Sequence, residues 1–483
     1  MPSKLSFQAS TDSFDAPTLV VIGKTKRLFA DDVRQALPAP INALWERMLE
    51  AAQPGDHGAV ERSWCDDHKT DRVIMCVVPE LHSRHNSPAR PDSIYEMLVK
   101  VLPKGDDVDI LLALDQAEHA MSCAIAVARA FPLYQAKSGE QDDDRSVRVA
   151  LLSASGDVEG LEAVTEGAAS TRMAARLVDT PASELNTSAF VEEARRVAAE
   201  TGAKIEVISG ESLRDRGFGG LWGVGKAATH PPALVVLSHE PDNADRTLCW
   251  VGKGIVYDTG GLSIKGKNNM PGMKADMAGA AAVLGAFRAA VRTRAKDRIH
   301  AILCLAENSV GPEATRPDDI LHLYSGKSVE VNNTDAEGRL VLGDGVAYAA
   351  KHLEPDIILD MATLTGAQLV ATGKKHAAVI CNDDELEAAA IRAGKRSGDL
   401  VHPLPYCPEF FRKEFKSEVA DLKNSVKDRA NAQCSCAAQF VAEHLSSYVG
   451  PWLHVDMAGA AGINARASGY GVALLLDLFI SGD

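Results

Sequence analysis

Seven of the charged side chains between residues 253 and 339 of this 483-residue sequence have types and positions that could serve one reaction centre. Four carboxylates in one crevice repel one another and cannot all ionise without compensating charge. A pair of divalent cations supplies that charge, because carboxylates can bridge two metals a few ångströms apart. The set therefore predicts a two-metal site, provided that its members converge. They are Lys253, Asp258, Lys265, Asp276, Asp335, Glu337 and Arg339.

The local spacing supports convergence only in part. Asp335 and Glu337 are two positions apart, so in an extended segment both would face the same side. Glycines at 252, 254, 260 and 261 permit tight backbone turns beside a packed site. Each carboxylate taken alone could equally be a helix cap or a solvated charge, and Asp276 stands where acidic residues favour the first turn of a helix. The metal hypothesis therefore depends on the whole set.

The elements that would position these residues are short apolar runs alternating with helical stretches. Strand, helix, strand repetition predicts a mainly parallel sheet covered on both faces, with ligands bound outside the carboxyl ends of its strands. The charged segments follow predicted strands. The strands are expected at 233–238, 247–252, 300–305, 357–361, 377–381 and 453–457, with helices at 279–291 and 340–351.

The first part of the chain predicts a separate, smaller α/β domain. Runs at 18–22 and 109–114 are typical of strands, and the alanine-rich stretch 117–131 is typical of a helix. The length also favours two domains over one. We expect an N-terminal α/β domain over 1–165 and a larger C-terminal catalytic domain over 166–483, with a linker helix near its start and a mainly parallel central sheet.

Several segments resemble the leucine aminopeptidase (cytosol aminopeptidase) family. NTDAEGRL at 333–340 matches the family's signature octapeptide without a break. The similarity covers roughly residues 175–480, and the sequence departs from the family's pattern at Ala278, within 307–320 and at 427–433. No departure removes a predicted ligand, so we expect these differences to affect pocket shape and substrate preference. The other matching segments are VGKGIVYDTGGLSIK at 251–265, MKADMAG at 273–279, ATLTGA at 362–367, VADLKN at 419–424 and WLHVDMAG at 452–459.

The resemblance implies a role for each residue of the set. One metal would be bound by Lys253, Asp258, Asp276 and Glu337. The second would be bound by Asp258, Asp335 and Glu337, so that Asp258 and Glu337 bridge the two. A water held between the metals would be the nucleophile, because the cations lower its pKa. Lys265 would polarise the peptide carbonyl, and Arg339 would hold a bicarbonate ion that acts as general base.

The resemblance also implies the substrate and the assembly. The substrate's free amine would bind a metal, which restricts hydrolysis to the amino-terminal residue of a peptide, leucine and other apolar residues being preferred. Backbone groups of Leu364 and Gly366 would bind the substrate, and Met273 and Thr363 would line its side-chain pocket. Family members are hexamers, so we expect a homohexamer. Zinc is expected in at least one site, although oxygen ligands plus one amine also suit manganese or magnesium.

Composition excludes several classes of partner. A formal charge of −15 repels phosphate backbones and anionic lipid, so neither nucleic acid nor a membrane is expected as a partner. The first residues, MPSKLSFQASTDSF, lack the apolar core of a signal peptide, and the apolar run at 471–480 is short and contains Asp477. Nine cysteines without a regular framework favour a reduced compartment. We therefore expect a cytoplasmic protein.

Other readings of these motifs remain open at this point. A metal-dependent phosphoesterase would also use clustered carboxylates, but it would need neither Lys253 nor the turn at 362–367. A non-catalytic DNA-binding scaffold conflicts with the negative charge. The segment 220–227 nearly forms a phosphate-binding loop, but Ala227 replaces the required hydroxyl residue, which favours a turn between helix and strand. His454 and Asp456 are expected to be core residues, and Cys434 and Cys436 incidental thiols.

Overall fold

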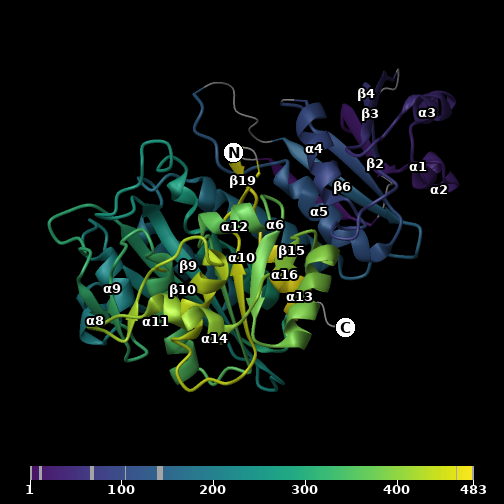
Figure 1. Ribbon diagram of the computed structural model, residues 1–483. Helices are drawn as coiled ribbons and strands as arrows, with labels where there is room; N and C mark the ends of the chain where they lie inside the picture. The colour runs from purple at the N-terminus through teal and green to yellow at the C-terminus, as the bar shows by residue number, and fades with distance from the viewer. Residues whose placement is uncertain are drawn as a thin grey trace. The chain divides into compact units, whose positions relative to one another are not determined.

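The protein divides into two compact units, as seen in a computed structural model. It describes residues 3–9, 14–65, 70–103, 105–138, 145–463 and 465–480. One unit comprises Met1–Arg172 with Ala393–Leu400, and the other comprises Met173–Arg392 with Val401–Asp483. Figure 1 shows the first mainly in purple and blue and the second in teal to yellow. The predicted two-domain α/β fold is confirmed, and the predicted boundary at 165/166 stays a prediction.

The first unit is built on a six-stranded sheet in the order β1-β6-β5-β2-β4-β3. Its strands pair in parallel, except that β3 runs antiparallel to β4. Strand β5 is buried along its whole length and β2 along all but its last residue, as expected for strands with both faces covered. The strands are β1 Lys4–Gln8, β2 Thr18–Lys24, β3 Ala59–Trp64, β4 Arg72–Val78, β5 Val108–Leu114 and β6 Ser146–Ser153. The helices are α1 Thr25–Leu28, α2 Asp31–Gln35, α3 Ala39–Ala51, α4 Pro91–Val101, η1 Ala117–His119 and α5 Ala120–Arg129. Helix α6 Leu161–Asp179 begins in the first unit and continues past Arg172 into the second.

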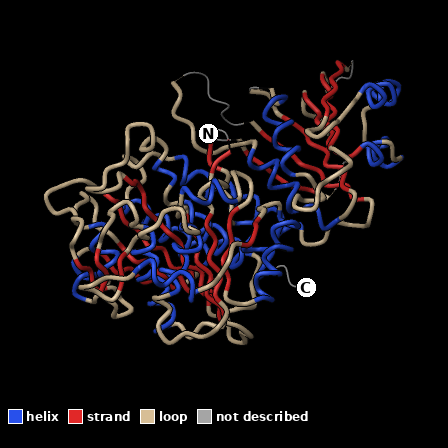
Figure 2. The backbone as a smooth tube through the Cα atoms, in the orientation of Figure 1, coloured by secondary structure: helices blue, strands red, loops and turns tan. Residues whose placement is uncertain are grey.

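The second unit is built on an eight-stranded sheet in the order β15-β14-β17-β13-β9-β10-β8-β7. Its four central strands, β17, β13, β9 and β10, run parallel, so the prediction of a mainly parallel central sheet is confirmed. Figure 2 shows these strands in red among blue helices. The strands are β7 Lys204–Ser209, β8 Ala233–His239, β9 Thr247–Asp258, β10 Arg298–Asn308, β13 Ile357–Ala362, β14 Ala377–Cys381, β15 Val401–Pro403 and β17 Trp452–Asp456.

Two layers of helices cover this sheet. Helix α10 packs on β9, β10 and β13 together with α7 and α16, whereas α11 packs on the same strands together with α9 and α15. The layers are α7 Thr187–Thr201, α10 Ala278–Arg292 and α16 Val472–Phe479, and α9 Gly219–Gly225, α11 Gly338–His352 and α15 Gln433–Ala442. The remaining elements are α8 Glu211–Asp215, η2 Met273–Ala275, β11 Ile320–His322, β12 Ser328–Glu330, α12 Gly366–Ala371, α13 Asp384–Ser397, α14 Pro408–Phe411, η3 Arg412–Phe415, β16 Leu422–Lys423, β18 Gly462–Ile463 and β19 Arg466–Ala467.

An irregularity near the end of β9 sets the direction of its last side chains. Ile255 pairs with Ala306 of β10, and the next pair is Asp258 with Asn308. Strand β9 therefore advances three residues where β10 advances two, which is a β-bulge. In a regular strand Lys253 and Asp258, five positions apart, would face opposite sides of the sheet. The extra residue reverses this alternation and lets both side chains reach the same site.

The glycines at 220, 223 and 225 lie in a helix, so the predicted turn is wrong for them, whereas Lys226 and Ala227 do lie in a turn after that helix. Residues Gly219–Gly225 make up α9, which packs against α11. A Cβ atom on Gly220 would lie 2.3 Å from the carbonyl oxygen of Leu340. Glycine is thus required there because two helix backbones approach closely, and not because of a turn or a bound phosphate.

A buried carboxylate ties α11 to its surroundings. Asp344 accepts hydrogen bonds from the backbone N–H groups of Leu221 and Tyr324, each at 2.8 Å. Burial raises the pKa of Asp344 to about 7 and outweighs the hydrogen bonds from backbone N–H groups, which lower the pKa. Helix α11 begins next to the charged cluster, so this carboxylate helps to fix the helix that presents part of the cluster.

We expect Asp344→Ala to lower the free energy of unfolding by about 2–4 kcal/mol, because two buried N–H groups lose their acceptor. The pKa of Asp344 is higher in the folded than in the unfolded protein, so its contribution is complete below the unfolded value and is lost as the pH rises through about 7. The difference between wild type and mutant should therefore be smaller at pH 8 than at pH 5 in urea unfolding. Asp215→Ala, on an exposed helix, should change stability by less than about 0.5 kcal/mol.

Candidate metal centre

The carboxyl ends of the four central parallel strands meet at one edge of the sheet. Asp258 ends β9, Asn308 ends β10, Asp456 ends β17, and Thr363 directly follows β13. Ligand sites of parallel sheets lie at this edge. The sequence placed the charged segments after strands, and the structure adds that β9 continues through Lys253 to Asp258, beyond the predicted end at 252.

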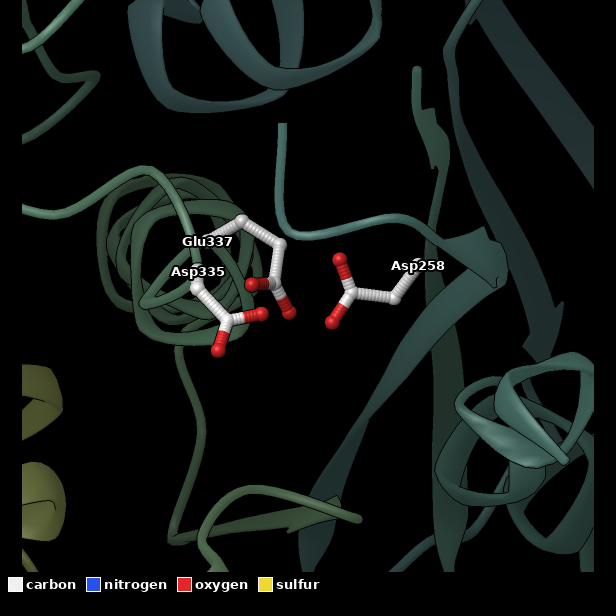
Figure 3. Close-up of side chains that lie close together, drawn as sticks. All are labelled: Asp258, Asp335 and Glu337. Atoms are coloured by element: carbon white, nitrogen blue, oxygen red, sulfur yellow. The ribbon is translucent and has the colours of Figure 1, made fainter. Parts of the chain in front are cut away.

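Three of the four predicted carboxylates converge at this edge. Ligand atoms of Asp258, Asp335 and Glu337 lie within 4.8 Å of one another, and Figure 3 shows their carboxyl groups pointing toward a common space. The argument that an extended segment would place Asp335 and Glu337 on the same side does not apply, because Asp335 lies in a turn and Glu337 is the N-cap of α11. The side chain of Asn333 accepts a hydrogen bond from the Asp335 N–H at 3.0 Å and shapes that turn.

Lys253 joins the fourth carboxylate to this cluster. Its Nζ lies 2.8 Å from Asp276 Oδ1 and 2.9 Å from Glu337 Oε1, and the residue is 2% exposed. Burial alone would lower the pKa of Lys253, but the surrounding carboxylates outweigh it and raise the pKa above its ordinary value. The Lys253 side chain is thus held inside the protein between two carboxyl groups.

Lys265 pairs with the other two carboxylates. Its Nζ lies 2.7 Å from Asp258 Oδ2 and 2.5 Å from Asp335 Oδ1. The carboxylates again overcome the effect of burial and raise the pKa of Lys265. All six side chains thus form one buried or half-buried cluster in which each lysine bridges two acids.

The cluster still carries more negative than positive charge. Burial raises the pKa of Asp258 to about 6 and that of Asp276 well above its ordinary range. For Glu337, burial is outweighed by Lys253, which lowers the pKa. Two buried oxygens, Asp276 Oδ2 and Glu337 Oε2, have no hydrogen-bond partner among the described residues. Convergent, unsatisfied carboxylate oxygens are the donor set that divalent cations require, so these residues fit a metal centre.

The predicted substrate-binding turn lies against the same cluster. Thr363 donates from its hydroxyl to Asp276 Oδ1 at 2.8 Å, and its carbonyl oxygen accepts from Lys253 at 3.0 Å. The N–H of Leu364 is already bonded to Asp456 Oδ1 at 3.0 Å, so the carbonyl oxygen is the backbone group that Leu364 can offer. Gly366 is exposed at the start of α12, and Met273 lies half-buried in η2, three residues before Asp276.

Arg339 is near the cluster without pairing to it. It is 4% exposed, in the first turn of α11, and Nη1 donates to the carbonyl oxygen of Asn424 at 3.0 Å. Its Nε has no hydrogen-bond partner among the described residues. Burial lowers the pKa of Arg339 to about 10, although nearby Glu337 opposes this shift. A buried guanidinium with an unused donor is suited to hold a small anion.

Comparison with known proteins identifies the family. The cytosol aminopeptidase family catalytic domain matches residues 172–476, and the M17 aminopeptidase N-terminal domain 2 matches residues 17–140. The chain is 50% identical over 98% of its length to the probable aminopeptidase NPEPL1 of Mus musculus, covering 92% of that protein. This chain belongs to the cytosol aminopeptidase family.

Solved structures agree with this assignment. The leucyl aminopeptidase of Trypanosoma brucei in complex with bestatin superposes with a TM-score of 0.92 at 37% identity, covering 100% of this chain and 96% of that one. The bottromycin maturation enzyme BotP in complex with Mn gives a TM-score of 0.80 at 28% identity, covering 96% of this chain and 99% of that one. Within the described residues of this family member, no helix is long and apolar enough to cross a lipid bilayer.

Two asparagines that the sequence analysis did not single out hold the family's motifs in place. Asn308 donates from Nδ2 to Asp258 Oδ1 at 2.8 Å and to the carbonyl oxygen of Thr334 at 3.0 Å. Asn424 accepts from the N–H of Asn332 and donates to the carbonyl oxygen of Ala336. Both stand in segments that resemble the family, at 307–320 and 419–424, and that likeness was the available signal. An uncharged amide side chain does not by itself indicate a metal site in a sequence.

His454 and Asp456 are core residues, as the sequence predicted. His454 is buried, and its Nδ1 lies 2.5 Å from Asp360 Oδ1. Asp456 accepts from Leu364 and from the hydroxyl of Thr365 at 2.7 Å, and the Cys434 thiol lies 3.4 Å from its Oδ2. Asp456 thus fixes the turn after β13, which borders the metal centre.

We expect Asn308→Ala to weaken divalent-metal affinity by about 10–100-fold, because Asp258 loses the partner that orients it. Calorimetric titration of chelator-treated protein with Zn²⁺ or Mn²⁺ measures this effect. Ser309→Ala is the matched control, since the Ser309 hydroxyl bonds Glu307 and not a carboxylate of the cluster. Equal affinities for Asn308→Ala and the control would contradict an orienting role for Asn308.

Proposed function

We propose that this chain is a two-metal aminopeptidase that removes the amino-terminal residue from peptides, with leucine and other apolar residues preferred. The observation that carries the proposal is the buried cluster in which Lys253 and Lys265 each bridge two carboxylates at the carboxyl ends of the parallel strands. Membership of the cytosol aminopeptidase family and similarity to leucyl aminopeptidases support it.

The ligand assignment that we propose is the one implied by the family resemblance. Lys253, Asp258, Asp276 and Glu337 would hold one cation, and Asp258, Asp335 and Glu337 the second. Two divalent cations held there would lower the pKa of a water and polarise the scissile carbonyl. Lys253 would have to release its proton to coordinate, and cations beside a buried amine favour that loss. We propose zinc, with manganese or magnesium as alternatives at one site. The manganese in the BotP structure supports a site of this class.

Two cationic side chains would act on the substrate without binding metal. With divalent cations neutralising Asp258 and Asp335, the Lys265 ammonium would be released to donate to the peptide carbonyl and stabilise the developing oxyanion. The unused donor of buried Arg339 supports its proposed role, which is to hold a bicarbonate ion as the general base. Both roles place positive charge where negative charge develops in the transition state.

The substrate would lie along the turn after β13. We propose that the free amine binds a metal, that Met273 and Thr363 line the pocket for the first side chain, and that Leu364 and Gly366 bind the peptide backbone. The contact of Thr363 with both Asp276 and Lys253 supports this placement. By analogy with the family we also propose a homohexamer in the cytoplasm.

A chelator should abolish hydrolysis of a leucyl substrate, and added Zn²⁺ or Mn²⁺ should restore it. Asp258→Ala and Glu337→Ala should be the most damaging ligand substitutions, because each would remove a bridging ligand. Activity and bound metal, by elemental analysis, are measured on the same samples. Full activity in protein shown to be free of metal would end the two-metal proposal.

Lys265→Ala should fold normally and keep its metals, yet lose about a hundredfold to a thousandfold in kcat, because it removes a donor to the transition state. Arg339→Ala should lose less, since a water can partly replace bicarbonate, and its activity should not respond to added bicarbonate. Metal content, melting temperature and kcat are compared on the same preparations. Parallel loss of all three in Lys265→Ala would show that the side chain only balances carboxylate charge.

A further inference from the structure

A hollow of about 670 Å³ lies beside the substrate-binding turn, a size that suits a peptide fragment. Its walls come from α12, from the segment after β15, and from the loop that precedes α15. Val370, on α12, is 91% exposed, so an apolar side chain borders this space without a protein partner. The lining residues that the argument uses are Gly366, Val370, Ala371, Leu404, Arg429 and Cys434.

One short turn of the chain joins the metal centre to the wall of the hollow. Thr363 contacts Lys253 at the cluster, and Gly366, three residues later, lines the hollow. Asp456 accepts a hydrogen bond from this turn and also contacts Cys434, which lines the hollow. Three residues span at most about 10 Å, a length comparable to that of the second and third residues of a bound peptide.

Arg429 places a positive charge on the wall of this hollow. It is exposed and has no ion pair among the described residues. Its loop is held by Glu414, which accepts from the Asp428 N–H at 3.2 Å and from the Asn431 side chain at 2.9 Å. Arg429 stands within 427–433, where the sequence departs from the family's pattern. An available guanidinium on an anchored loop is a binding group for a carboxylate.

We propose that this hollow binds the carboxyl-terminal residues of a short peptide. The terminal carboxylate would pair with Arg429, and an apolar side chain would pack on Val370, Ala371 and Leu404. The inference rests on the proposed aminopeptidase function and adds a substrate class to it: di- and tripeptides with a free carboxyl terminus. A chain with a formal charge of −15 otherwise disfavours anionic substrates. A preference for peptides with a free carboxyl terminus would thus have a local cause, the charge of Arg429.

The test compares leucyl-glycyl-leucine with its carboxyl-terminal amide. Wild-type kcat/KM should be about fivefold higher for the acid, the scale of one exposed ion pair, and the ratio should fall as salt is added. Arg429→Ala should lower kcat/KM for the acid and bring the ratio to about one. Arg429→Lys should keep part of the preference. Lys427→Ala, an exposed cation on the same loop, should keep all of it.

Each other outcome would overturn the inference. Equal kcat/KM for acid and amide in the wild type would show that the hollow does not bind the carboxylate. A ratio that is unchanged in Arg429→Ala would show the same. A changed mass of Arg429→Ala by light scattering, with the ratio intact, would assign the hollow to an interface between copies of the chain. A leucyl anilide, which ends before the hollow, separates the two proposals: if metal-loaded enzyme cleaves no substrate, including the anilide, the aminopeptidase proposal itself is wrong.

Discussion

Repulsion among Asp258, Asp276, Asp335 and Glu337 is the constraint on which the rest of the second unit depends. Four acids within one small space are tolerated only because Lys253 and Lys265 lie between them, each within 2.9 Å of two carboxylate oxygens. Holding like charges together demands a rigid frame, because any loose segment would move away. The frame is a parallel sheet covered on both faces, with the first turn of α11 directed at its edge.

The same frame explains how recognition and chemistry share one location. Asp456, at the end of β17, fixes the turn after β13, and that turn lies between the charged cluster and the hollow beside α12. Asn308, at the end of β10, joins Asp258 to the segment that carries Asp335. Neighbouring strand ends therefore supply one of the acids, Asp258, and groups that hold the segments carrying the rest of the site. A displacement of one strand end would therefore shift the proposed substrate contacts and the proposed metal ligands together.

The sequence predicted the sheet, its parallel centre and the family, because apolar runs and an unbroken octapeptide at 333–340 are local signals. It could not predict how Lys253 and Asp258 face the same site, since a bulge depends on pairing with β10. It offered only a conditional reason for Asp335 and Glu337 to converge, that of an extended segment, whereas Asn333 holds Asp335 in a turn before α11. It also predicted a turn at the glycines of α9. Gly220 is required by its close approach to Leu340, in a helix 120 residues away, and the local sequence does not reveal that contact. Tertiary pairing decided each of these points.

The bulge in β9 makes strand pairing, and not only residue identity, a condition for assembling the charged cluster. A variant that paired β9 with β10 without the bulge would direct the aspartate to the opposite side of the sheet, because five positions separate Lys253 from Asp258. Such a protein could keep every ligand in its sequence, fold, and still assemble no centre. A related sequence with one residue fewer between these two positions would have an even separation, so both side chains would face the same side of the sheet without a bulge.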